Sequence, residues 1–423
     1  MPEMKNSGID WIGACPASWQ FLKGKYIFSL RNDKGNMIEL QLLSPTQKFG
    51  VIPQFLFEEL TTNTTVKVKE NANLSQFKTI HRGDFCISLR SFQGGFEYCT
   101  YEGVVSPAYQ VFYAITKICD NYFKHLFKDQ SFIGKMNSYT LSLRDGKNIS
   151  FVDFGNTYLP IPPISEQKII SSFLDEKCAE VGNLFADIQA EIDILEEYKN
   201  SVITEKVTKG LNSDVAMKDS CTEWVGVIPL SWNIHPVYYY FGERKSKNYD
   251  LKEQNLLSLS YGKIIRKDIN TNGGLLPANF STYNIVEADD IIIRPTDLQN
   301  DKRSLRTGLV TEHGIISSAY IDLMPKSGVN SKYFYYLLHA YDIMKVFYNM
   351  GNGVRQGLNY SEFSKLMVVA PPQKEQQEIA DYLDTKCTEI DSIIEAKKEQ
   401  LKVLDEYKKS IIYEYVTGKK EVV

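Results

Sequence analysis

The stretch PPISEQKIISSFLDEKCAEV, residues 162–181, returns as PPQKEQQEIADYLDTKCTEI at residues 371–390. From residue 162 to residue 208, 19 of 47 positions are identical to those 209 residues further along the chain. Each copy follows a region with the mixed composition of a globular domain. The opening of a long helix that occurs twice indicates that the chain contains two copies of one unit.

Three further pairs of motifs occur in the same order and extend the duplication. MKNSGIDWIGACPASW at 4–19 matches MKDSCTEWVGVIPLSW at 217–232, and these stretches hold all four tryptophans, which we expect to be mostly core. SPAY at 106 matches SSAY at 317, and RDGKNIS at 144 matches RQGLNYS at 355. The copies differ most in their middles, roughly residues 21–100 and 233–311, which suggests two related sites with different specificities.

The composition is that of a soluble protein with two domains and additional elements. The chain has 423 residues, of which 43% are hydrophobic and 24% charged. Its N-terminus has no apolar signal region, and no run reaches the ~20 apolar residues of a membrane span. Seven cysteines without a CxxC pair predict a reducing cytoplasm, and the matched Cys178 and Cys387 read as buried structural thiols.

The charge is unevenly distributed along the chain. The formal net charge is -4, but residues 163–208 hold 4 basic and 10 acidic residues, and residues 372–417 hold 7 and 11. These two helices therefore carry -10, and the rest of the chain carries +6. A mildly basic pair of globular regions allows nucleic-acid contact without demonstrating it.

Local patterns predict an α+β fold in each globular region. The runs DFCISLR at 84, DIIIRP at 290 and YIDLM at 320 read as strands. The aromatic-rich runs at 121–127 and 331–348 read as helices. In the long repeated helices, apolar residues recur at heptad spacing. The first helix has Leu174, Val181, Ile188, Leu195 and Val202 with Leu184, Phe185 and Ile192 beside them, and the second has Leu383, Ile390, Ile394, Leu401, Leu404 and Ile411 with Lys397 in the seam register.

A heptad seam needs a partner, and the other copy is the obvious one. We expect the two helices to pair as an antiparallel coiled coil with pseudo-two-fold symmetry, holding a globular unit at each end as a molecular ruler. The predicted divisions are a first recognition domain at 1–161, a spacer helix at 162–210, a second recognition domain at 211–370 and a second spacer helix at 371–423.

With its motifs in duplicate, the whole chain resembles the specificity subunit of type I restriction–modification enzymes. The carrying residues are MKNSGIDWIGACPASW, GVVSPAYQ, RDGKNIS and PPISEQKIISSFLDEKC with their second copies. The resemblance implies two target recognition domains that each read one half of a split site in double-stranded DNA. It also implies docking of two methyltransferase subunits and, through the complex, of restriction or translocase subunits. S-adenosylmethionine, ATP and Mg would belong to those partners, and no cofactor to this chain.

The residues themselves show no catalytic or metal site. The tetrads at 160–163 and 369–372 lack the Asn or Asp of a methyltransferase motif, and no glycine-rich phosphate loop with Lys-Ser/Thr is present. The run Asp175–Lys177 reads as a solvated helix face rather than a nuclease site. A DNA-reading subunit without catalysis is therefore favoured, and a coiled-coil adaptor between proteins is the alternative.

Candidate DNA contacts lie in two kinds of segment. Arg, Gln and Asn suit base edges, and glycine permits close backbone approach. The predicted set is Arg90, Ser91, Gln93, Gly94, Arg144, Lys147, Asn148, Arg294, Thr296, Asp297, Asn300, Lys302, Arg303, Arg306, Arg355, Gln356 and Asn359. The stretches from Arg90 and Arg294 could equally be ordinary polar loops. Arg144 and Arg355 occur in both copies, so they suit the phosphate backbone, although a structural ion pair is the competing interpretation.

Overall fold

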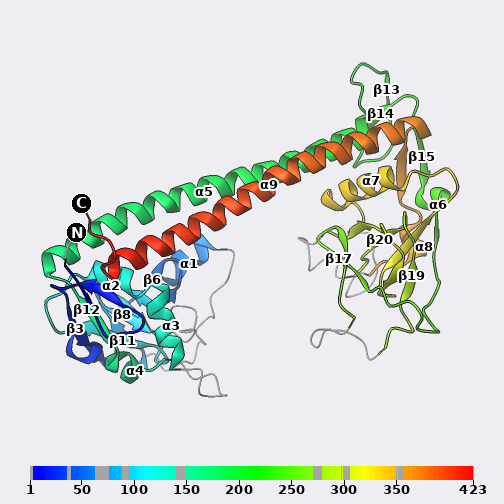
Figure 1. The fold of residues 1–423 in the computed structure, drawn as a ribbon. Coiled ribbons are helices and arrows are strands. Elements are labelled where there is room, and N and C mark those ends of the chain that lie inside the picture. The colour runs from blue at the N-terminus through cyan, green and yellow to red at the C-terminus, as the bar shows by residue number, and fades with distance from the viewer. Residues whose placement is uncertain are drawn as a thin grey trace. The chain divides into compact units, whose positions relative to one another are not determined.

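The computed structural model describes residues 3–35, 40–61, 76–87, 95–139, 149–269, 279–296, 298, 305–348, 350 and 357–422. The chain divides into two compact units. Unit 1 comprises Met1–Gln189 and Glu399–Val423, and unit 2 comprises Ala190–Lys398. Each unit therefore contains one globular region and one end of each long helix (Figure 1).

Unit 1 is built on a four-stranded antiparallel sheet in the order β4-β11-β8-β9. Its strands are β4 (Phe28–Arg31), β11 (Gln110–Ala114), β8 (Phe85–Ile87) and β9 (Phe96–Tyr98). Two-stranded pairs surround it: β1 (Met4–Asn6) with β2 (Ala14–Pro16), β3 (Gln20–Lys23) with β12 (Tyr158–Ile161), β5 (Leu43–Thr46) with β6 (Gly50–Pro53), and β7 (Lys78–Ile80) with β10 (Gly103–Val105). The helices are η1 (Gly24–Tyr26), α1 (Gln54–Leu60), α2 (Asp120–Leu126), α3 (Gln130–Ser138) and α4 (Phe151–Asn156). Phenylalanines from the sheet and from these helices, such as Phe28, Phe112 and Phe154, fill the core with edge-to-face and tilted ring contacts.

Unit 2 repeats this topology strand for strand. Its sheet has the order β16-β23-β20-β21, with β16 (Phe241–Glu243), β23 (Ile321–Pro325), β20 (Ile291–Ile293) and β21 (Thr307–Leu309). The surrounding pairs are β13 (Met217–Asp219) with β14 (Val227–Pro229), β15 (Asn233–Pro236) with β24 (Met367–Ala370), β17 (Leu257–Ser260) with β18 (Lys263–Arg266), and β19 (Asn284–Val286) with β22 (Gly314–Ile316). The helices are α6 (Val237–Tyr240), α7 (Ser331–Ile343) and α8 (Tyr360–Phe363). The predicted strands and helices are thus confirmed, although α7 ends five residues before the predicted run does.

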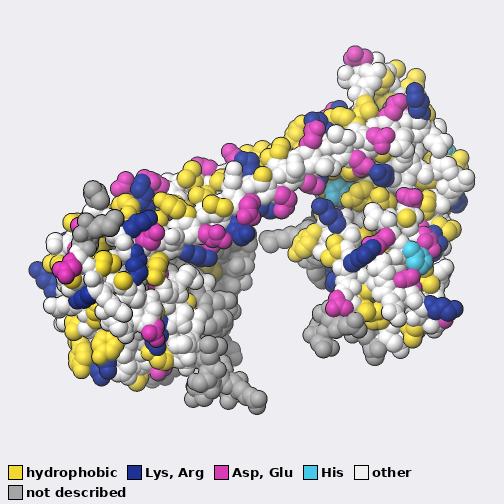
Figure 2. All heavy atoms as spheres, viewed as in Figure 1, with side chains coloured by type: hydrophobic (Ala, Val, Ile, Leu, Met, Phe, Trp, Pro, Cys, Tyr) yellow, Lys and Arg dark blue, Asp and Glu magenta, His cyan; other side chains and the backbone are white. Residues whose placement is uncertain are grey.

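The two long helices are α5 (Ile164–Lys209) and α9 (Gln373–Val416). Inside unit 1 the start of α5 lies beside the end of α9, because the rings of Phe173 and Tyr415 are 4.5 Å apart. Inside unit 2 the later part of α5 lies beside the first half of α9, where Lys199 and Asp391 form an ion pair of 2.6 Å. The predicted antiparallel pairing is therefore present in both units, and acidic and basic side chains intersperse along the exposed helix surfaces (Figure 2).

The seam is apolar with one charged interruption. Leu174, Val181, Ile192 and Val202 are buried on α5, and Leu383, Ile390, Ile394 and Ile411 are buried on α9. Lys397, the charged residue in the seam register, forms an ion pair with Glu191 of α5. Leu184 and Phe185 were expected beside the seam, but they are 51% and 40% exposed. Because the apolar stripe on α5 is wider than the contact with α9, these two side chains lie outside that contact.

The tryptophan motif receives the end of a long helix in each unit. Trp19 and Trp232 are buried, as predicted. At the end of α5, Gly210 has φ +80° and lies against the Trp232 ring, and Lys209 donates to the carbonyl of Val225 at 3.3 Å. At the end of α9, Gly418 has φ +73° and lies against Trp19 and Pro16. In each unit the repeated motif therefore packs against the end of a long helix that is capped by a glycine.

The structure also describes the surroundings of the matched cysteines and of Asp175 on the long helices. Cys387 is buried and Cys178 half-buried, each within a helix. Asp175 is not simply solvated, because Lys124 and His125 of α2 contact its carboxylate at 2.7 and 2.9 Å. Burial opposes ionisation, but these hydrogen bonds lower the pKa of Asp175 to about 2. Across the described residues, no helix combines the length and hydropathy required to cross a membrane.

Candidate nucleic-acid interface

The middle regions that differ most between the two copies each contain a candidate contact segment. These two segments lie at the same position of equivalent sheets. Residues 88–95 connect β8 to β9, and residues 294–306 connect β20 to β21. Both are therefore loops between antiparallel neighbours, and we call them hairpin loop 1 and hairpin loop 2. Each loop leaves the edge pair of its four-stranded sheet at the same end. The sequence predicted a strand before each stretch, but not that the stretches are topological counterparts.

Four of the predicted contact residues lie in the described part of the chain: Arg294, Thr296, Arg306 and Asn359. The remainder lie outside it, namely Arg90, Ser91, Gln93, Gly94, Arg144, Lys147, Asn148, Asp297, Asn300, Lys302, Arg303, Arg355 and Gln356. Arg294 and Thr296 are half-buried at the start of hairpin loop 2. Their contact with DNA stays a prediction.

Arg306 is fully buried, so the prediction that it contacts DNA directly is corrected. Its Nε donates to the Tyr348 hydroxyl at 3.0 Å, and its guanidinium also donates to the carbonyls of Arg294 and Thr296. The backbone N–H of Arg294 in turn donates to the Arg306 carbonyl at 2.8 Å. Arg306 therefore closes the base of hairpin loop 2 from inside, and it acts by positioning the loop.

Helix α7 holds this arginine in place. Asp342, which is fully buried, accepts the backbone N–H of Arg306 and accepts the Tyr348 hydroxyl at 2.9 Å. Burial raises the pKa of Asp342, although the bond from Arg306 opposes the shift. Lys345 donates to the same Tyr348 hydroxyl at 3.0 Å. A buried polar network of this kind is rigid when its members are paired, so it fixes the loop base relative to the helix.

A second candidate segment reaches the same end of each sheet. In unit 2, the segment that carries Arg355 continues into Leu358, whose N–H donates to the carbonyl of Pro295 at 3.0 Å. In unit 1, the segment that carries Arg144 continues into Ile149, whose carbonyl accepts the side chain of Gln110 at 3.0 Å. Gln110 pairs with Ile87, the residue from which hairpin loop 1 begins. Segments distant in sequence therefore converge beside each hairpin loop.

Asn359 has a structural role in this arrangement. Its side chain accepts the N–H of Glu362 at 3.0 Å, and Glu362 accepts the N–H of Asn359, which makes a capping box at the start of α8. In unit 1 the equivalent cap of α4 is Ser150 with Asp153. The caps are 209 residues apart, whereas the RxGxNxS motifs align at 211. The spacing of Asn359 to Glu362 was a readable capping signature.

The base of hairpin loop 1 also holds a buried charged side chain, but this side chain is acidic, whereas Arg306 at the base of hairpin loop 2 is basic. Glu97 of β9 is 1% exposed, and both of its carboxylate oxygens accept from Lys128 Nζ at 2.8 Å. Burial raises the pKa of Glu97 to about 7, although Lys128 opposes the shift. In each unit a buried charged side chain at the base of the hairpin therefore contacts a residue of the helical region, through an ion pair to Lys128 in unit 1 and through a hydrogen bond to Tyr348 in unit 2. No local sequence pattern indicates these pairings, because the partners are far apart along the chain.

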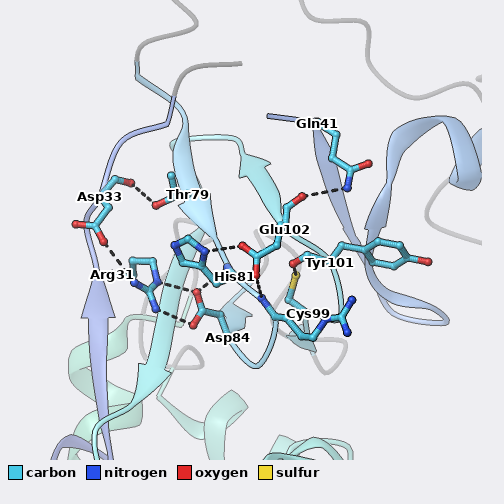
Figure 3. Close-up of polar contacts among 10 residues, drawn as sticks. Arg31, Asp33, Gln41, Thr79, His81, Asp84, Cys99, Tyr101 and Glu102 are labelled. Atoms are coloured by element: carbon cyan, nitrogen blue, oxygen red, sulfur yellow. Dashed lines mark hydrogen bonds and ion pairs between the residues drawn. The ribbon is translucent and has the colours of Figure 1, made fainter. Parts of the chain in front are cut away.

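One ion pair is identical in the two units. Arg31 donates to both oxygens of Asp84 at 2.7 and 3.0 Å, and Arg244 donates to both oxygens of Asp290 at 2.6 and 3.0 Å. Figure 3 shows Arg31 pointing at Asp84, and His81 pointing at Glu102 from an adjacent turn. Bidentate pairs of this kind have a strongly preferred geometry. They fix the outer strand of each sheet to the strand that leads into the hairpin loop.

The described residues contain no group of three or more His, Cys, Asp or Glu side chains that could hold a metal ion. The described part of the candidate interface consists instead of the bases of the two hairpin loops, each with a buried charged side chain, Glu97 in unit 1 and Arg306 in unit 2. Such a surface can bind a ligand through hydrogen bonds and charge, and its two versions differ in sequence.

Comparison with known proteins identifies the family. The family model for the "Type I restriction modification DNA specificity domain" matches residues 17–192 and 241–403, which together exceed half of the chain. The chain belongs to this family. The two matched stretches correspond to the two copies recognised from the repeated motifs.

Individual relatives are more distant. The "Putative type I restriction enzyme MjaX specificity subunit" of Methanocaldococcus jannaschii is 26% identical over 62% of this chain. The match spans 59% of the length of that protein. The "Type I restriction enzyme MjaVIII specificity subunit" of the same organism is 23% identical, with 67% of each chain covered. A solved chain described by "Structural basis underlying complex assembly and conformational transition of the type I R-M system" matches 96% of this chain and 99% of its own length with a TM-score of 0.67 at 14% identity, which shows a shared fold.

Proposed function

We propose that this chain is the non-catalytic DNA-recognition subunit of a type I restriction–modification complex. The observation that carries the proposal is the duplicated sheet with unlike hairpin loops, within a chain that belongs to the DNA specificity family. Equivalent placement would present both loops to duplex DNA in the same manner, while their different side chains would read different bases. The target would then be bipartite and asymmetric.

The proposed parts follow the divisions expected from the sequence. Residues 1–161 and 211–370 would be the recognition domains, and residues 162–210 and 371–423 would be the spacers that set the gap between half-sites. Arg144 and Arg355 would bind phosphate groups next to the loops, a role supported by the convergence of their segments with the hairpin loops in each unit. Arg294 and Thr296 would lie at the margin of the second half-site.

The long helices would also dock partner subunits. In unit 1 they expose Leu184, Phe185, Val403 and Tyr407, and in unit 2 they expose Ile194, Tyr198 and Ile393. Exposed apolar side chains on an otherwise charged helix pair favour burial against another protein. We infer two methyltransferase subunits per chain, one on each such surface, which native mass spectrometry of the saturated complex would count.

The test of the proposed function is selection of duplexes by the full-length chain from a random pool, followed by sequencing and footprinting. The expected result is two short sequences separated by unspecified bases. The alternative, a coiled-coil adaptor that only joins proteins, predicts no enrichment of any duplex. Enrichment of one uninterrupted site would contradict the assignment of one half-site to each unit.

A further inference from the structure

The tip of the β17–β18 hairpin in unit 2 carries a side chain that the fold does not use. Tyr261 is 82% exposed, more than any other large hydrophobic side chain that the structure describes. Its φ is +45°, in the left-handed region that disfavours a bulky residue. Gly262 follows with φ +77°, so the turn is one that usually takes Asn or Gly at its first position. Exposure and backbone strain together point to a role outside folding.

The tip lies next to the base of hairpin loop 2. A Cβ added to Gly262 would be 3.2 Å from the Cβ of Leu305 and 3.6 Å from the carbonyl oxygen of Thr307. Leu305 directly precedes Arg306, which closes that loop. The hydroxyl of Tyr335 on α7 donates to the Gly262 carbonyl at 3.2 Å, which fixes the tip. Tyr261 is therefore held in the neighbourhood of the proposed reading loop.

A cation accompanies the ring. Lys263 is 74% exposed, and its Nζ is 3.9 Å from Asp391 Oδ2. An exposed ion pair at that distance contributes little, so the ammonium group can exchange it for a phosphate. The tip therefore combines an aromatic face with a positive charge, which is the combination that binds nucleic-acid strands by stacking and neutralisation.

Unit 1 has the same combination at the corresponding hairpin. Strands β5 and β6 occupy the place of β17 and β18, because Leu42 and Leu256 form equivalent parallel bridges to β10 and β22. The turn between β5 and β6 holds Lys48 and Phe49, with the Lys48 Nζ 5.2 Å from the ring centroid. An aromatic side chain and a lysine thus recur at both tips, although the two turns differ in length and sequence.

We propose that the tip Tyr261–Lys263 is a second DNA-contact element of unit 2. The Tyr261 ring stacks on the face of a base or enters a base step, and Lys263 binds a phosphate beside it. The contact rests on the proposed function, to which it adds a chemical class of interaction. Because every base has an aromatic face, the tip adds affinity and marks one edge of the half-site without specifying its sequence.

A control side chain lies beside the four-stranded sheet of unit 2, at the end opposite to hairpin loop 2. Tyr238 is 53% exposed and lies on α6, just before Phe241. Phe241 pairs with Pro325 at one end of β23, whereas Ile321 at its other end pairs with Ile293, where hairpin loop 2 begins. Tyr238 is therefore also an exposed tyrosine, but it is remote from the loop.

The experiment measures binding of the full-length chain to its selected duplex, with 2-aminopurine placed at successive positions of the unit 2 half-site. Tyr261→Gly is expected to weaken binding on the order of tenfold and to remove the fluorescence change at one position. Its melting temperature is expected to stay equal or to rise, because glycine relieves the left-handed strain. Tyr261→Phe should bind like the wild type, and so should Tyr238→Ala.

The outcomes separate the inference from the function on which it rests. Unchanged affinity and unchanged 2-aminopurine signals in Tyr261→Gly would overturn the contact, while wild-type binding would still uphold the proposed function. A lowered melting temperature in Tyr261→Gly would show that the ring has a structural role and would also overturn it. Reduced capture of a methyltransferase subunit with intact DNA binding would assign the tip to protein docking instead. Failure of the wild-type chain to bind any duplex would overturn both proposals.

Discussion

Unit 2 contains a buried carboxyl group that should make its stability depend on pH. Asp322 of β23 is 1% exposed, and among the described residues neither of its carboxyl oxygens has a hydrogen-bond partner. Burial, and then repulsion from Asp290, raise the pKa of Asp322 from 3.8 to about 8. Asp290 is itself paired with Arg244, whose Nε is 4.0 Å from Asp322. Asp322 is therefore protonated at neutral pH.

The sign of the effect follows from proton uptake. Between about pH 4 and pH 8 the unfolded chain ionises Asp322 and the folded chain does not, so the free energy of unfolding falls as the pH rises. A difference of about 4 pKa units at 1.36 kcal/mol each sets a ceiling of roughly 6 kcal/mol. Relaxation around the ionised group reduces this, and we expect a loss of about 2–4 kcal/mol in unit 2 by pH 8.

Unit 1 supplies the substitution that should abolish this dependence. Asp322 pairs with Ile292, and the matching residue of β11, which pairs with Cys86, is Val111. Asp322→Val should therefore flatten the pH dependence of unit 2 and stabilise it most at pH 8. The reciprocal Val111→Asp should destabilise unit 1 as the pH rises.

The assay is hydrogen exchange of the sheet amides in the full-length chain between pH 5.5 and 8.5, corrected for intrinsic exchange rates. Peptides from β20 and β23 report on unit 2, and peptides from β8 and β11 report on unit 1. Equal pH dependence in wild type and Asp322→Val would refute the assignment of the effect to this carboxyl group.

Other predictions concern the hairpin anchors, the helix ends and the phosphate contacts. Glu97→Gln should remove a loss of stability in unit 1 between about pH 5 and pH 7, since burial raises the pKa of Glu97 to about 7; the same exchange experiment measures it. Arg306→Ala should destabilise unit 2 by about 3–5 kcal/mol in denaturant unfolding, because it removes the buried guanidinium that donates to the Tyr348 hydroxyl and that places a positive charge near the buried Asp342 carboxyl group. Gly418→Ala should lower the melting temperature, since its Cβ would overlap Pro16 at φ +73°, whereas Gly182→Ala, with open space around it on α5, should raise stability by about 0.5–1 kcal/mol. Arg144→Ala and Arg355→Ala should weaken binding to all duplexes about equally and reduce its salt dependence; a changed sequence preference would contradict the phosphate role.

The helical part of the fold was predictable because its signals are long. Heptad spacing continues through Val202 on α5 and Ile411 on α9, and the Pro-Pro starts fix where each helix begins. The sheets were only partly predictable, because most of their strands have three to five residues and no extended alternation. Their equivalence becomes visible only in the pairing order, which no local pattern encodes.

The segments of the candidate interface could be selected from the sequence, and their contact with DNA stays a prediction, but the supporting role of Arg306 could not be predicted. An arginine in a polar stretch is usually exposed, so Arg306 read as a contact residue. Its burial depends on Asp342 of α7 and on Tyr348, which follows that helix, and these partners are 36 and 42 residues away along the chain. Asn359 is exposed, and its contact with DNA stays a prediction, but its spacing to Glu362 also carried a capping signal. Direct and supporting residues have the same chemistry, and only burial separates them.

The opposite polarity of the two anchors limits how the recognition elements can be exchanged. Hairpin loop 1 ends next to a strand carboxylate, Glu97, bound to Lys128, whereas hairpin loop 2 ends in a buried arginine, Arg306, whose guanidinium donates to the Tyr348 hydroxyl. Moving hairpin loop 2 with Arg306 into unit 1 would bring a buried guanidinium towards Lys128 and provide neither the Tyr348 hydroxyl nor the nearby Asp342 carboxyl group. Unpaired buried charge costs several kcal/mol, which is comparable to the stability of a whole domain. A change of target by exchange between units should therefore succeed only when the strand hairpin and the helix that anchors it move together.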